Sequence, residues 1–416
     1  MAQSGKRRNL IPWVLIGVPV VIATVAVALL LIPSGSKQAA GQTGKPLAVA
    51  WHKTFGGDTG NSIVVLPDGG FAVAGGTKLK DVLYEDVWVL RLDSTGKIVW
   101  DKTFGETKAD SVSRANSIVA LADGGFAVAG FTSSKGAGHH DVWVLRLDGA
   151  GKILWDKTFG GPKADGANSI VALSDGGFAV AGWSASKGAG FQDAWVLRLD
   201  STGRILWDKT YSGPKYTHAG ANSIVATPDG GFAVAGSTQS NGAGGHDAWV
   251  LRLDSKGRRL WVKIFGGPNA DRASSIVTLP DGGFAVAGTT SSKGSGNKDA
   301  RVLRLDSAGK ILWDKTFGGS KRDGASSIVA LPDGGFAVAG FTSSKGAAKE
   351  DAWILRLDSI GRMLWDKSIG GPGSDVALSI VALTDGGFAA TGWTMPPKIG
   401  LRLQPWVLRI GHLSAK

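Results

Sequence analysis

Residues 168–211 read NSIVALSDGGFAVAGWSASKGAGFQDAWVLRLDSTGRILWDKTY, and close variants of this stretch recur along the chain. The stretch contains four short apolar runs, rich in Val, Ile, Phe and Trp, that are separated by Gly-containing turns. Such runs predict β-strands, because they are too short for helices and are bounded by turn residues. We therefore expect strands at 169–173, 177–183, 194–200 and 204–211.

The repeat has a period of about 53 residues and occurs seven times. An Asp-Gly-Gly-Phe element marks each unit, starting at Asp68, Asp123, Asp175, Asp229, Asp281, Asp333 and Asp385. Short turns with Gly join the first strand to the second and the third to the fourth, as expected for tight hairpins. The other two connections are longer and differ between units. One end of each unit is therefore constant, and the other end carries the variation.

Seven four-stranded units can close into a β-propeller or stack as an open solenoid. The last unit ends after its third strand, and a matching fourth strand lies at the other end of the domain, within 45–56. An open solenoid would leave both edge strands unpaired, which favours aggregation. We therefore predict an all-β, seven-bladed β-propeller of four-stranded antiparallel blades over 45–416, with a last blade built from 378–410 and 45–56.

Two Trp positions recur in the units. The fourth-strand set comprises Trp51, Trp100, Trp155, Trp207, Trp261, Trp313 and Trp365, and a second set lies in the third strands, where Arg301 replaces Trp in the fifth unit. Each indole ring buries about 150–250 Å². Because the rings recur at fixed strand positions, we expect them to pack within and between blades rather than to stack on sugars.

The stretch Leu199-Asp-Ser-Thr-Gly-Arg-Ile-Leu-Trp207 resembles the signature of PQQ-like (quinoprotein-type) propeller repeats. The resemblance implies that this Trp docks one blade on the next. The family ranges from quinone-dependent dehydrogenases to non-catalytic scaffolds of the bacterial envelope, such as BamB-like assembly factors. This chain has no Cys and so lacks the adjacent Cys pair that holds the cofactor in the dehydrogenases. We therefore expect a BamB-like, non-catalytic protein without a cofactor.

Residues 10–32 contain no charged residue and would extend about 35 Å as a helix, enough to cross a bilayer. Three basic residues precede this run, so the positive-inside rule places 1–9 in the cytoplasm and exports the remainder. Residues 33–44 are polar and small, which is typical of a flexible linker. A cleaved signal peptide is the alternative. Both interpretations place the propeller in the periplasm or outside the cell.

Catalytic or metal-binding groups would stand out as departures from the repeat. His139 and His140 lie in the variable loop of the second unit, while His218 and His246 lie in connections of the fourth. These imidazoles are candidates for a metal site, but the two blades are not neighbours and no carboxylate pattern accompanies the His residues. We therefore predict no metal site and no catalytic residue.

Two further acidic patterns are interpreted as structural. An Asp precedes each of the first six third strands and is expected to accept backbone N–H bonds and fix the adjoining loop. These residues are Asp86, Asp141, Asp193, Asp247, Asp299 and Asp351. Arg198 and Asp200 alternate on one strand, as do their equivalents, and we expect an ion pair or a turn cap there.

The formal net charge of +12 invites a nucleic-acid hypothesis. Four of these charges lie in 1–44 and the others are spread over the blades, so we expect no nucleic-acid partner. The sequence predicts a membrane-anchored, extracytoplasmic scaffold that binds an unidentified protein or envelope component. One alternative is a carbohydrate- or cell-wall-binding propeller, and the second is a propeller enzyme with a site on the loop face. Candidate sugar-stacking aromatics are Tyr84, Trp183, Phe191, Tyr216 and Trp393.

Overall fold

The computed structural model describes residues 47–78, 85–105, 112–211, 218–239, 245–346, 349–396 and 402–412. The predicted anchor at 10–32, the linker at 33–44 and the aromatic candidates Tyr84 and Tyr216 lie outside these ranges. Within them, the chain forms no helix of the length and apolar character that a membrane crossing requires.

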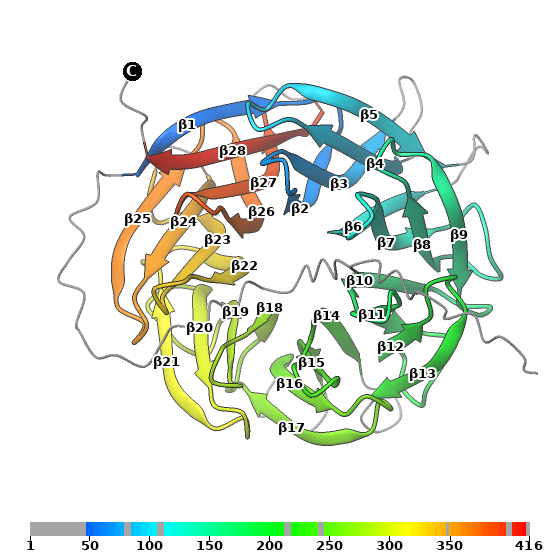
Figure 1. The fold of residues 1–416 in the computed structure, drawn as a ribbon. Coiled ribbons are helices and arrows are strands. Elements are labelled where there is room, and N and C mark those ends of the chain that lie inside the picture. Colours follow the sequence, from blue (N-terminus) through cyan, green and yellow to red (C-terminus); the bar gives the residue numbers. More distant parts are fainter. Residues whose placement is uncertain are drawn as a thin grey trace, which may run out of the picture.

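The described strands form seven four-stranded antiparallel sheets around a central axis (Figure 1). Blades one and two contain β2 (Thr59–Val65), β3 (Phe71–Lys78), β4 (Glu85–Leu92), β5 (Ile98–Phe104), β6 (Ser113–Ala120), β7 (Phe126–Thr132), β8 (Asp141–Leu147) and β9 (Ile153–Phe159). Blades three and four contain β10 (Asp165–Ala172), β11 (Phe178–Ser184), β12 (Asp193–Leu199), β13 (Ile205–Tyr211), β14 (Ala219–Ala226), β15 (Phe232–Thr238), β16 (Asp247–Leu253) and β17 (Arg259–Phe265). Blades five and six contain β18 (Asp271–Thr278), β19 (Phe284–Thr290), β20 (Asp299–Leu305), β21 (Ile311–Phe317), β22 (Asp323–Ala330), β23 (Phe336–Thr342), β24 (Asp351–Leu357) and β25 (Met363–Ile369). Blade seven contains β26 (Ser374–Ala382), β27 (Phe388–Met395), β28 (Gln404–His412) and β1 (Leu47–Thr54).

The seventh blade closes the ring with strands from both ends of the chain. Strand β1 is its outermost strand and pairs with β28, from Leu47 opposite His412 to Thr54 opposite Trp406. The seven-bladed propeller and its closing strand are thus confirmed, and the open solenoid is excluded.

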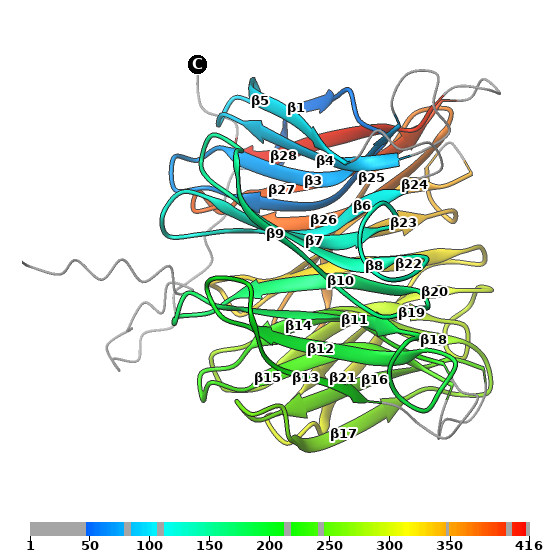
Figure 2. The ribbon, with the colours of Figure 1, turned by 90° about the vertical axis from the view of Figure 1, so that its right-hand side faces the viewer.

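The two faces of the disc differ as the sequence predicts. One face, which we call the hairpin face, carries the two tight turns of each blade, such as 174–177 and 200–203 in blade three. The opposite face, the loop face, carries the longer connections, such as 185–192. Figure 2 shows the disc from the side, with strands running between the two faces.

For Arg198 and Asp200 the sequence predicts an ion pair or a turn cap, and the contacts on the hairpin face show which of these each residue forms. Arg198 does not pair with Asp200 but forms an ion pair with Asp175 in the neighbouring hairpin. Asp200 caps its own turn, because its Oδ1 accepts the backbone N–H of Thr202 at 2.9 Å and of Arg204 at 3.0 Å. Gly203 completes this turn with φ of 80°, a conformation that favours Gly.

The core lies between blades as well as within them. Phe178 and Trp195 of blade three are both 1% exposed and pack in one cluster with Ala129 and Val144 of blade two. The third-strand indole N–H donates to an Asp of the outer strand, as from Trp195 to Asp208 at 3.1 Å. In blade five, buried Arg301 donates to the equivalent Asp in place of the indole.

The outer-strand Trp residues lie at the junctions between blades. The rings of Trp155 and Phe178 in the next blade are 5.9 Å apart at 72°, and Trp155 Nε1 donates to the carbonyl of Ser201 at 3.2 Å. Each of the seven Trp–Phe pairs spans one junction: Trp51–Phe71, Trp100–Phe126, Trp155–Phe178, Trp207–Phe232, Trp261–Phe284, Trp313–Phe336 and Trp365–Phe388. Six of these pairs are edge-on, and Trp365–Phe388 is more tilted at 60°, so the contact is closely similar at every junction.

Candidate functional site

The loop face carries one variable residue per blade at the entrance to the third strand. We call this set the junction ring: Glu85, His140, Gln192, His246, Lys298, Glu350 and Leu403. The backbone of this residue is joined to the next blade, as where the N–H of Asp165 donates to the carbonyl of His140 at 2.7 Å. The same bond, from Asp323 to Lys298, is 2.7 Å long. The backbone arrangement is therefore the same at these positions, while the side chains differ between blades.

The four predicted His residues fall into two separate groups. His139 and His140 lie in blade two, where the His140 ring packs edge-on against Phe131 at 5.1 Å. Gln239 bridges the other two: its Oε1 lies 2.9 Å from His218 Nδ1, and its Nε2 lies 3.1 Å from His246 Nε2. Among the described residues no three His, Asp or Glu side chains form a group suited to a metal ion.

Sequence reasoning missed Gln239, which directly follows β15 at a position where blades two, five and six have Ser. Its amide orders both imidazoles, and His218 also stacks on Phe191 at 5.6 Å and 27°. Phe191 is 56% exposed, whereas Trp183 and Trp393 are only partly exposed. Phe191 is thus the candidate sugar-stacking ring that stands out most from the described surface.

Burial changes the protonation of two of these His residues. Burial lowers the pKa of His140, and the charge of His139 lowers it further against the opposing effect of Asp141. Burial likewise lowers the pKa of His246, with additional lowering from Arg272 and His218. Both imidazoles are therefore more readily neutral than an exposed His.

Three of the Asp residues that precede the third strands, Asp141, Asp193 and Asp299, accept backbone N–H bonds from the adjoining loop. Oδ2 of Asp141 accepts from Ala137 at 2.9 Å and from Gly138 at 3.1 Å. A second buried Asp, at the start of the next inner strand, was not predicted: Asp165 accepts the N–H of Gly161 at 2.9 Å. A side chain at Gly160 would collide with both carboxylates. These acidic groups are occupied by backbone donors, as expected for structural residues.

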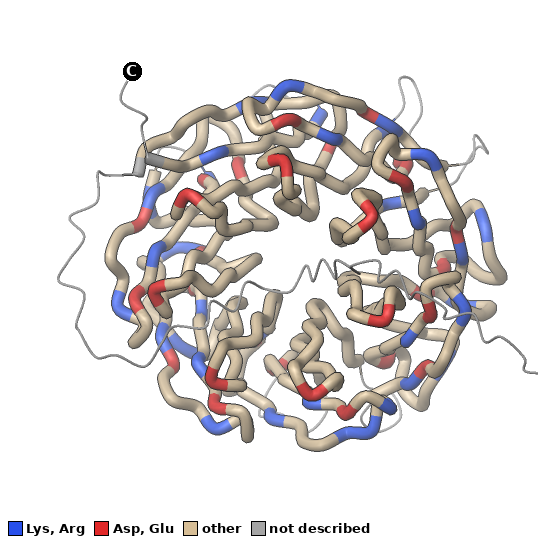
Figure 3. The backbone as a smooth tube through the Cα atoms, in the orientation of Figure 1, with Lys and Arg blue, Asp and Glu red and all other residues tan. Residues whose placement is uncertain are grey.

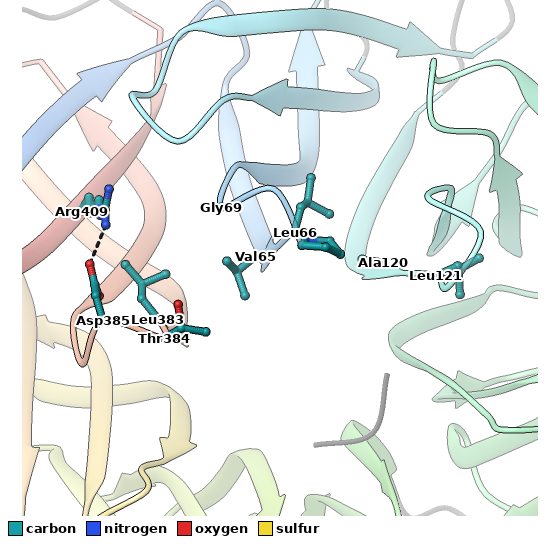
Figure 4. Close-up of a pocket in the computed structure, with 10 residues that line it drawn as sticks. Val65, Leu66, Gly69, Ala120, Leu121, Leu383, Thr384, Asp385 and Arg409 are labelled. Carbon is teal, nitrogen blue, oxygen red and sulfur yellow. Dashed lines mark hydrogen bonds and ion pairs between the residues drawn. The ribbon is translucent and has the colours of Figure 1, made fainter. Parts of the chain in front are cut away.

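A cavity of about 400 Å³ opens near the central axis, between the hairpins of blades seven, one and two (Figure 4). Its walls are largely apolar, and an ion pair between Asp385 and Arg409 lies at one side, with a distance of 2.6 Å. The lining includes Val65, Leu66, Leu121, Leu383 and Thr384. The predicted His candidates are absent from this lining, so the cavity and the loop-face groups are separate features.

Comparisons with known proteins support the architecture. No family model matches the chain. The regulatory protein FlaEY of Caulobacter vibrioides is 28% identical over 194 residues, which cover 40% of this chain but only 20% of that protein. The chain thus spans about a fifth of that curated relative.

Solved structures of low sequence identity share the propeller fold. The WD40 domain of Neurospora crassa Pan2 is 12% identical with a TM-score of 0.54, covering 86% of this chain and 90% of that one. A periplasmic gluconolactonase of Pseudomonas aeruginosa is 14% identical with a TM-score of 0.50, covering 82% and 99%. A Dyadobacter fermentans protein of unknown function is 11% identical with a TM-score of 0.50, covering 88% and 99%. At these identities the likeness concerns the fold alone.

Proposed function

We propose that the protein is a membrane-anchored, extracytoplasmic scaffold whose hairpin face lies toward the bilayer and whose loop face binds a protein or another envelope component. The observation that carries this proposal is the position of Leu47. It pairs with His412 at the hairpin-face end of the seventh blade, so the chain enters the propeller from that face. An anchor at 10–32 and a linker at 33–44 would then hold the hairpin face near the membrane.

The edge of the hairpin face also has the composition of a membrane-proximal surface. Each outer strand in blades one to six carries exposed apolar side chains in its first two residues, for example Ile205 at 43% and Leu206 at 58%, except that blade four has Arg259 before Leu260. A cation precedes these side chains in every case, at Lys97, Lys152, Arg204, Arg258, Lys310 and Arg362. Figure 3 shows Lys and Arg positions concentrated along the outer edge of the disc. Apolar groups flanked by cations favour an interface with anionic lipids.

The loop face supplies the variation that partner recognition requires. Its junction ring contains acidic, basic, imidazole and amide side chains on one repeated backbone frame. Near-identical blades also present similar loops side by side, so that a partner with several contact points gains from multivalency. The partial similarity to a regulatory protein is compatible with such a role. A BamB-like, non-catalytic character is part of this proposal.

Because the chain has no Cys, single Cys substitutions test this arrangement directly. In blade three, Thr202→Cys lies on the hairpin face and Ala189→Cys on the loop face, and both parent residues are exposed. We expect a membrane-impermeant maleimide to label Ala189→Cys in intact cells. A fluorophore at Thr202→Cys should be quenched more strongly by lipid-attached quenchers than one at Ala189→Cys. Labelling only after lysis would contradict export, and equal quenching would contradict the orientation.

A carbohydrate-binding propeller is the second candidate, favoured by the exposed ring of Phe191 stacked on His218. Exposed aromatic faces can stack on sugar rings, and the neighbouring Gln239 offers amide hydrogen bonds. A glycan array with the wild-type protein and Phe191→Ala tests this role. Binding that is lost in Phe191→Ala would favour it over a protein scaffold.

A further inference from the structure

Arg114 and Arg272 occupy the same position in two blades, as the second residue of inner strands β6 and β18. Gly324 holds this position in blade six. A Cβ at Gly324 would lie 2.6 Å from Phe341 of its own blade and 3.0 Å from Thr289 of the preceding blade. This position therefore lies at the junction with the preceding blade.

At the junction between blades one and two, this geometry produces a closed ion pair. Arg114 Nε donates to Oε1 of Glu85 at 2.8 Å, and a second guanidinium nitrogen bonds the other carboxylate oxygen. The side chain of Glu85 is only 7% exposed. At the junction between blades four and five, His246 stands where Glu85 stands, so Arg272 faces an imidazole instead of a carboxylate. The backbone joins the two segments here, because the N–H of Asp271 donates to the carbonyl of His246 at 2.5 Å. Arg272 also contributes, after burial, to lowering the pKa of His246.

The next junction adds two more cations. Lys298 and Arg322 are joined by a backbone bridge between blades five and six, and the Arg322 side chain is 58% exposed. Burial lowers the pKa of Lys298, and the charges of Arg322 and Arg272 lower it further against the opposing effect of Glu350. Nη1 of Arg322 lies 3.9 Å from Glu350. Lys298 and Arg322 thus lie near the carboxylate of Glu350 on the loop face, and Arg272 is a further cation close to Lys298.

The buried Asp residues beneath this cluster have partners within the protein, although Oδ1 of Asp271 accepts no hydrogen bond among the described residues and lies 3.5 Å from Nη1 of Arg301. Oδ2 of Asp271 accepts from Ser292 Oγ at 2.7 Å, Asp299 accepts from Gly296 at 3.0 Å, and Asp323 accepts from Gly319 at 2.9 Å. These carboxylates are therefore engaged within the protein, while the side chains of Arg272 and Arg322 are exposed on the loop face.

We propose that Arg272, Lys298 and Arg322 form a binding site for an oxyanion, a phosphate or carboxylate group of a ligand that approaches the loop face. Guanidinium groups bind such groups in bidentate fashion, and an ammonium adds a mobile point charge. The site goes beyond the proposed scaffold function, since it names the ligand chemistry. It also does not depend on the orientation of the disc relative to a membrane.

The test uses the full-length protein in detergent, with inorganic phosphate and acetate titrated separately and with sodium chloride at matched ionic strength as the reference. We expect phosphate or acetate, or both, to raise the melting temperature beyond the chloride reference, and the two arms identify the preferred group. Arg272→Gln and Lys298→Gln should each weaken this binding at least tenfold. Arg114→Gln should leave it unchanged, because that guanidinium is already paired with Glu85.

A gain of a carboxylate offers a second test that does not remove a cation. His246→Glu recreates the arrangement of Glu85 and Arg114 and should fold, since blade one already uses this pair. The new carboxylate should occupy Arg272 and weaken oxyanion binding at least tenfold. The proposal is overturned if neither anion exceeds chloride, or if binding is equal in wild type, Arg272→Gln and Lys298→Gln. The Cys-labelling experiment remains independent of either result.

Discussion

The ring of Trp155 in blade two packs edge-on against Phe178 in blade three, with centroids 5.9 Å apart. Because this contact joins separate sheets, Trp155→Ala should lower the free energy of unfolding by about 2–4 kcal/mol through lost burial and lost ring contact. Denaturant titration followed by circular dichroism measures the change. Phe191→Ala is the matched control, since this ring is 56% exposed and its loss should change stability by less than about 0.5 kcal/mol. Equal effects would contradict the junction role of Trp155.

Gly203 shows how the same indole restricts the turn that it covers. Its φ is 80°, and a Cβ would lie 2.9 Å from the Trp155 ring. Gly124 has an equivalent φ of 81° but no atom within 4 Å of such a Cβ. Both Gly→Ala variants carry a conformational penalty of about 1 kcal/mol for the positive φ. Gly203→Ala must in addition displace the Trp155 ring, so we expect it to be less stable than Gly124→Ala. Paired thermal melts measure this difference, and identical melting temperatures would contradict it.

The fold was predictable because its determinants are local and repeated. Alternating apolar runs and Gly turns specify each hairpin, and seven copies specify the blade, as in the unit from Asn168 to Tyr211. The closure of the ring was predictable because 45–56 matches the strand that the last unit lacks. The partner of Arg198 was less predictable, because Asp200 is closer in sequence while Asp175 is closer across the two hairpins.

The pairing of β1 with β28 makes closure testable. Deleting 45–54 should expose the edge of β28 and the buried ring of Trp406, and we expect aggregation or a large loss of stability. Leu47 and His412 are register partners, so a short loop from 412 to 47 in a circular permutant that begins at Gly57 should restore a native melting curve. A truncated monomer with unchanged melting would contradict the closing role of β1.

The loop-face features were harder to predict because they depend on contacts between blades. Gln239 and His246 lie in one connection of blade four and His218 lies in the connection that enters this blade, and nothing in their spacing indicates a shared amide. Among the described residues, the absence of a carboxylate partner for Arg272 becomes visible only by comparison with Arg114, whose partner Glu85 is 29 residues earlier. The cluster could have been identified from the sequence by aligning the seven repeats and comparing the charges at equivalent positions.

Blade four breaks the bond between the third-strand Trp and the outer strand. Val262 stands where Asp208 accepts the indole N–H of Trp195 at 3.1 Å, and among the described residues Trp249 Nε1 is buried with no hydrogen-bond partner. Because Val262 is 41% exposed, Val262→Asp should supply an acceptor at little desolvation cost and raise stability by about 1 kcal/mol. Asp208→Val should lower stability by about 1–3 kcal/mol. Denaturation midpoints measure both, and a destabilised Val262→Asp would contradict the assignment.

Burial lowers the pKa of His52, His140 and His246 below the ordinary value of 6.5. Between the folded-state pKa values and 6.5 the unfolded chain binds more protons than the native one, so stability should rise with pH through this window and fall on acidification. The double variant His140→Gln/His246→Gln should therefore show a smaller loss of melting temperature on going from about pH 7 to pH 5. Burial raises the pKa of Asp299, so this residue contributes a pH dependence of stability with the opposite sign. Because Asp299 is present in both the wild type and the double variant, its contribution cancels when the two are compared. An unchanged slope would show that neither imidazole is kept neutral by the fold.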